Sequence, residues 1–99
     1  MPSHTMETVF YIRFTIKTPD GFEPYAKVFI GNDRQTATDI FSKLKGDNLV
    51  NESNILQLDF VETKNDLPLN INVLRCTLQE MAENFKIITR EVFKNTCLK

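Results

Sequence analysis

One cysteine lies at a position where its thiol could act in catalysis. Cys76 comes directly before a segment that we predict to be a helix, and a thiol at a helix N-terminus can have a lowered pKa and act as a nucleophile. Nucleophilic catalysis also needs a positioned base, and the sole histidine, His4, lies in a segment that we expect to be a loose tail. We therefore expect Cys76 to be packed between a strand and a helix. A small enzyme that uses Cys76 stays as the second alternative.

Other polar residues do not form a recognisable catalytic or ligand set. Asp59 and Glu62 are an odd number of positions apart on a predicted strand, so they point to opposite faces and cannot cooperate directly. Residues 31–34 open a helix and could hold an anion, but Asp33 would repel a phosphate, so we interpret them as a helix cap. The carboxylates and amides of residues 47–52, which are Asp47, Asn48, Asn51 and Glu52, match no calcium-loop spacing. We expect no catalytic residues, no cofactor and no metal.

The chain alternates apolar and polar residues in two early segments. Residues 8–17 read as a strand, and residues 25–30 as a second strand, separated by the turn sequence Thr18-Pro19-Asp20-Gly21. We expect a hairpin with a loop of moderate length. A helix should follow from about residue 33 to residue 45, with Gly46 at its left-handed C-cap.

The same order recurs in the second half. Residues 55–63 alternate as a third strand, and residues 69–73 as a fourth. Thr77 and Glu80 have the spacing of a capping box, and a long amphipathic run follows them. We expect that helix to bury one stripe and to leave Ile87 exposed on the opposite side. The expected stripe is Leu78, Met81, Phe85, Ile88 and Val92, flanked by Ala82 and Phe93.

These elements predict an α+β fold. We expect a two-layer sandwich in ββαββα order, with a four-stranded antiparallel sheet and both helices packed on one face. Residues 1–5 are expected to be a disordered tail and residues 6–99 a single α+β domain, with a pseudo-repeat of residues 8–46 and 55–97. The order of the strands in the sheet is left open by the pattern.

The composition and the charge balance oppose several classes of binding partner. Among 99 residues, 41% are hydrophobic, and 12 basic against 13 acidic side chains give a net charge of -1, which opposes nucleic-acid and acidic-membrane partners. The N-terminus resembles no export signal, and Cys76 and Cys97 bracket a predicted helix about 30 Å long, too far apart to pair. Reduced thiols fit a cytoplasmic protein.

The uncovered sheet face carries the functional expectation. Its outward positions hold more aromatic and aliphatic side chains than a solvated face needs, and contiguous apolar surface is typical of an interface. We expect a non-enzymatic module that forms a homodimer or binds a protein partner there, with Tyr11, Tyr25 and Phe29 as anchors. Rings beside Arg13 and Lys27 leave a single-stranded nucleic-acid-binding sheet as the first alternative. The interface candidates are Val9, Tyr11, Arg13, Tyr25, Lys27, Phe29, Asp59, Val61 and Leu74.

Overall fold

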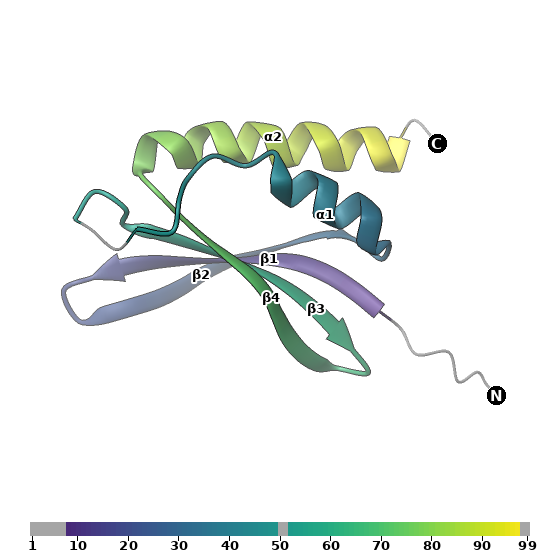
Figure 1. The fold of residues 1–99 in the computed structure, drawn as a ribbon, viewed down its shortest axis with the longest axis horizontal. Coiled ribbons are helices and arrows are strands. Elements are labelled where there is room, and N and C mark those ends of the chain that lie inside the picture. The colour runs from purple at the N-terminus through teal and green to yellow at the C-terminus, as the bar shows by residue number, and fades with distance from the viewer. Residues whose placement is uncertain (1–7, 50–51, 98–99) are drawn as a thin grey trace.

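The computed structural model describes residues 8–49 and 52–97 and has the predicted α+β architecture. Both helices lie on one side of a four-stranded sheet, as Figure 1 shows. The predicted tail at residues 1–5 lies outside the described residues. The elements are β1 (Thr8–Thr18), β2 (Gly21–Gly31), α1 (Arg34–Ser42), β3 (Leu56–Lys64), β4 (Leu67–Cys76) and α2 (Leu78–Cys97).

Two hairpins join at the centre of the sheet. The strand order is β2-β1-β3-β4, and each neighbouring pair is antiparallel. The first hairpin closes at the pair Thr18 and Gly21, so its loop is shorter than expected. In the second, Asn65 and Asp66 have φ values of 54° and 66°, as the two central residues of a type I′ turn require. Both turns let the strands run nearly to the hairpin tips.

Aromatic rings fill the layer between the sheet and the helices. Phe10, Ile12 and Phe14 of β1 are fully or almost fully buried, as are the inward side chains of β3. Phe41 of α1 stacks on Phe60 of β3, with 5.0 Å between ring centroids. Asp33 is the N-cap of α1, and its side chain accepts a hydrogen bond from the Thr36 backbone N–H at 2.9 Å. The predicted cap is thereby confirmed.

The first helix is shorter than the pattern predicted, because α1 ends at Ser42 and Lys43 is its C-cap. Gly46 therefore has another role. It has a φ of +147°, and a Cβ there would lie 2.4 Å from the carbonyl oxygen of Arg75. Next to it, Asp47 and Arg75 exchange two backbone hydrogen bonds of 2.8 and 2.7 Å. Gly46 thus lets the segment after α1 approach the end of β4.

A buried asparagine fixes the same segment to the second helix. The Asn84 side chain is fully buried in α2, where its Oδ1 accepts from the Lys45 backbone N–H at 2.6 Å. Its Nδ2 donates to the Lys45 carbonyl at 2.9 Å. The backbone N–H and carbonyl of Lys45 and both ends of the Asn84 carboxamide therefore satisfy one another.

The helix α2 is rotated relative to the predicted stripe. Its capping box is confirmed, because Thr77 Oγ1 accepts from the Glu80 N–H at 3.1 Å and Glu80 Oε1 accepts from the Thr77 N–H at 2.9 Å. Ile87 is buried, which contradicts the expectation that it faces solvent. The cause is α1, which lies beside α2 and is joined to it by a 3.0 Å ion pair between Lys43 and Glu91. In exchange, Leu78, Phe85 and Phe93 are exposed.

Candidate functional site on the open sheet face

Two aromatic rings and a lysine form the centre of the open face, which we define as the sheet surface turned away from the helices. Tyr11 of β1 and Phe29 of β2 are cross-strand partners, and their rings meet edge to face at 6.0 Å between centroids. The Lys27 ammonium lies 4.8 Å from the Tyr11 ring centroid and 5.9 Å from that of Phe29. Tyr11 is buried beneath this arrangement, whereas Phe29 keeps 59% of its surface exposed. Phe29 is thus the accessible ring of the cluster.

A hollow of about 350 Å³ opens beside these rings. Four predicted interface residues come together there, since Val9, Tyr11, Lys27 and Phe29 all line it. The sequence interpretation missed the remaining lining residues, which are Thr63, Asp66 and Pro68. The turn at Asn65 and Asp66 was the available signal, because a tight reversal there places Pro68 opposite Thr63 and brings both to the rim.

An ion pair covers the middle of the open face. Arg13 donates from Nε at 3.2 Å and from Nη2 at 3.1 Å to Oδ2 of Asp59. Gln57 donates to the other oxygen of Asp59 at 3.2 Å. Asp59 is buried, while the Arg13 side chain stays partly exposed. Arg13 thus neutralises the buried carboxylate of Asp59 across the β1 and β3 pair.

The open face carries a basic excess that the net charge of the chain hides. Strand alternation places Lys17 on the same face as Arg13, and Lys27 stands beside them on β2. Carboxylates on this side among residues 8–49 and 52–97 include Asp59, which Arg13 neutralises, and Asp66 at the rim of the hollow. A bound group with negative charge is therefore favoured here over one with positive charge.

Val61 is too buried to serve in an interface. It faces Tyr11 on one neighbouring strand and Asn70 on the other, and its side chain is 1% exposed. It supports the ring cluster from within the sheet surface and offers no area to a partner.

Tyr25 and Leu74 lie on the helix side, which contradicts their assignment to the open face. A register shift in β2 skips Tyr25, so its ring approaches Phe14 on the covered side at 6.2 Å between centroids. A second shift, in β4, skips Ile71, and Leu74 then pairs with Leu58 and packs against the core. Each bulge reverses the alternation that follows it. The sequence pattern alone does not reveal either shift.

Cys76 does not have the environment of a nucleophile. Its side chain is fully buried, with Sγ 3.9 Å from the sulfur of Met81. Burial and the nearby Glu80 carboxylate raise its pKa to about 11, so the thiol stays protonated at neutral pH. The expectation of a packed thiol is confirmed.

The described residues contain no group of three or more side chains of the types that could hold a metal ion. Within the same ranges, no helix has the length and apolar character needed to cross a bilayer. The chain matches no known protein-family model, no curated protein and no solved structure. The open face therefore has to be interpreted from its own geometry.

Proposed function

We propose that this chain is a non-enzymatic interaction module that binds a protein partner through the open sheet face. The observation that supports it is the cluster of Tyr11, Lys27 and Phe29 beside a hollow, where an exposed ring is held by a buried one. A rigid aromatic anchor loses little conformational entropy on binding, which is why such residues often dominate interface energetics. A cytoplasmic location is part of the proposal, because the free thiol of Cys76 fits a reducing compartment.

The partner should present an acidic side chain next to an apolar one. Phe29 offers area for the apolar group, and Lys27 and Lys17 offer positive charge. The Lys27 ammonium already lies over two rings, so a carboxylate can approach it while the lysine stem stays in place.

A phage-displayed random peptide library is a direct test. Peptides enriched on the wild-type chain should carry acidic and apolar residues, and their binding should fall about tenfold or more for Phe29→Lys and for Lys27→Glu, a loss of about 1.4 kcal/mol or more for each. Phe93→Lys is the matched control, because it changes an equally exposed phenylalanine on α2. Peptides that bind Phe29→Lys as well as wild type would contradict the proposal.

The same variants separate the two other readings of this face. A second copy of the chain as the partner would make Phe29→Lys convert a dimer into a monomer. A single-stranded nucleic acid as the partner would bind with an affinity that falls steeply with salt and falls further on Lys27→Glu. Lys27 is a cleaner choice for that test than Arg13, because Arg13→Glu would place a carboxylate against buried Asp59. The burial of Tyr11 opposes this reading, because only Phe29 of the pair is free to stack on a base.

A further inference from the structure

The helix α2 has more apolar surface than the fold covers. Its buried side is formed by Met81, Asn84, Ile88 and, against α1, Ile87. About a third of a turn away runs a second row, whose members lie within about 80° of one another around the helix axis at 3.6 residues per turn. We call this row the outer stripe, and its residues are Leu78, Ala82, Phe85, Thr89 and Phe93. All five are exposed.

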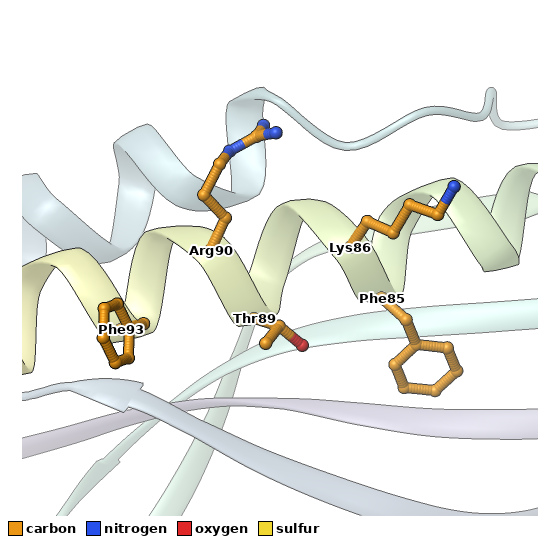
Figure 2. A pocket seen from close by; sticks show the side chains of 5 residues that line it. All are labelled: Phe85, Lys86, Thr89, Arg90 and Phe93. Carbon is orange, nitrogen blue, oxygen red and sulfur yellow. The ribbon is translucent and has the colours of Figure 1, made fainter.

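The outer stripe borders a groove at the β2 edge of the molecule. Figure 2 shows Phe85, Thr89 and Phe93 projecting from the same side of α2, with Lys86 and Arg90 directed away from them. The groove has a volume of about 540 Å³ and is lined by these five residues. The Phe85 ring rests on Phe14 at 5.1 Å between centroids, so the stripe is held in place by the core.

The order of residues along the outer stripe is self-complementary. Reading the helix backwards about a point between Phe85 and Lys86 exchanges Leu78 with Phe93 and Ala82 with Thr89. Phe85 is exchanged with Lys86, so in such a pair each Phe85 lies about one residue, or 1.5 Å, along the axis from its own counterpart. In an antiparallel pair of helices about a two-fold axis, residue i contacts residue j and residue j contacts residue i. Large side chains meet large ones and small meet small, which lets the helix axes approach to about 8–10 Å.

We propose that the outer stripe is the site where a second copy of this chain docks, by antiparallel packing of α2 against α2. This surface is distinct from the open face, so a dimer would leave Phe29 free for another partner. Leu78 and Phe93 are 68% and 61% exposed, and Phe85 is 39% exposed although it lies mid-helix. Together with Tyr25, which is 48% exposed and whose ring lies 6.2 Å from that of Phe14, they present the area of about two full aromatic side chains, roughly 400 Å² per copy.

That area predicts a weak dimer. Counted on both copies it gives roughly 800 Å², and the stems of Lys86 and Arg90 extend it toward the lower limit of about 1,200 Å² for specific interfaces. We therefore expect a Kd in the micromolar range or above, about -8 kcal/mol or less favourable.

Docking through the helix is favoured over pairing of the β2 edges. β2 contains Pro24, which has no N–H to donate, and a bulge at Tyr25 directly after it. Lys27 adds a charge to the same edge. These are features that protect edge strands from pairing with another chain.

Light scattering coupled to size-exclusion chromatography, over a concentration series up to about 1 mM, tests the proposal. The mass should rise from 11.5 kDa toward twice that value. Phe93→Lys and Leu78→Glu should each weaken dimerisation about tenfold or more. The double variant Leu78→Glu/Phe93→Lys places opposite charges at both pairings of these two residues and should recover a large part of the affinity.

The control is Phe29→Lys, which should dimerise as the wild type does, while circular dichroism verifies that every variant is folded. A wild type that stays monomeric at 1 mM, or a dimer that Phe93→Lys leaves intact, would overturn the proposal. Loss of the dimer on Phe29→Lys with retention on Phe93→Lys would move the two-fold contact to the open face. Failure of the double variant to recover affinity would refute the antiparallel register.

Discussion

At the scale of single residues, the buried carboxylate of Asp59 sets the shape of the open face. It accepts hydrogen bonds from Arg13 and Gln57 on neighbouring positions and leaves neither oxygen without a partner. Burial of a charge costs free energy unless the charge is paired. We therefore expect Arg13 to stay paired with Asp59 and not to bind a ligand. The basic character of the surface then depends mainly on Lys27 and Lys17.

Arg13→Met should destabilise the fold by about 1–3 kcal/mol, because it leaves the Asp59 carboxylate with Gln57 as its remaining side-chain partner. Half of the Arg13 side chain is in contact with solvent, so the loss should be smaller than for a fully buried pair. Urea denaturation measures it. The double variant Arg13→Met/Asp59→Leu should recover most of the lost stability. A double variant as unstable as the sum of both single changes would show that the pair does not act as a unit.

A basic partner for Asp59 could be predicted because Arg13, Lys27 and Asp59 all fall on outward positions of the sheet. The choice of Arg13 depends on the pairing of β1 with β3, which the sequence pattern leaves open. The face on which Tyr25 lies could not be predicted. A bulge that leaves Tyr25 unpaired decides that face, and the alternation of apolar and polar residues around Tyr25 does not reveal the bulge.

At the scale of elements, α2 is rotated about its axis relative to the orientation that its apolar stripe predicts. Asn84 and Glu91 are polar, so a search for an apolar stripe places them outside the core, yet both are buried. Asn84 is satisfied by the backbone of Lys45 and Glu91 by the ammonium of Lys43, and both partners come from the far end of α1. The sequence predicts the existence and ends of α2. The side that faces inward depends on partners that only the tertiary structure supplies.

Asn84→Leu should destabilise the protein by about 2–3 kcal/mol, because the N–H and carbonyl of Lys45 would both lose their side-chain partner at a partly buried position. For a domain of this size that corresponds to a fall in Tm of roughly 10 °C or more. Gln79→Ala, an exposed change on the same helix, is the matched control and should have little effect. A Tm for Asn84→Leu equal to that of the control would contradict the role of Asn84 in fixing the connector.

At the scale of the whole molecule, the two ββα halves are joined by the β1 and β3 pairing and by contacts between the helices. The order of elements and the layer arrangement could be predicted from alternation and capping alone. The strand order could not, because hairpins that lie side by side and hairpins that interleave place the same side chains on the same faces. Conversely, the pattern assigns Leu78 and Phe85 of the outer stripe to the core, because it does not say how much of an apolar helix surface one chain can cover.

The ion pair between the helices makes stability depend on pH. A hydrogen bond from Lys43, together with the charges of Lys43 and Lys94, lowers the pKa of Glu91 from its ordinary value of 4.5. Since the carboxylate form is favoured in the folded state, its contribution is present above that value and is lost as pH falls through the lowered pKa. Glu91→Gln should therefore reduce Tm at pH 7, and the difference from wild type should shrink toward about pH 3.

The matched control is Glu83→Gln, which removes an exposed carboxylate 3.8 Å from Lys86 on the same helix. It should change Tm little at either pH. A Glu91→Gln variant whose Tm differs from wild type by the same amount at both pH values would contradict an ionic contribution of Glu91.

The pairing of β1 with β3, which we call the seam, also determines how the chain folds. Each hairpin closes through a two-residue turn, so its contacts are local and can form within microseconds. The seam instead pairs positions as distant as Thr8 and Lys64, which requires closure of a long loop. The rate of folding should thus be governed by the meeting of two preformed hairpins, and substitutions in Ile12 or Phe60 at the seam should slow folding more than equal losses of stability elsewhere.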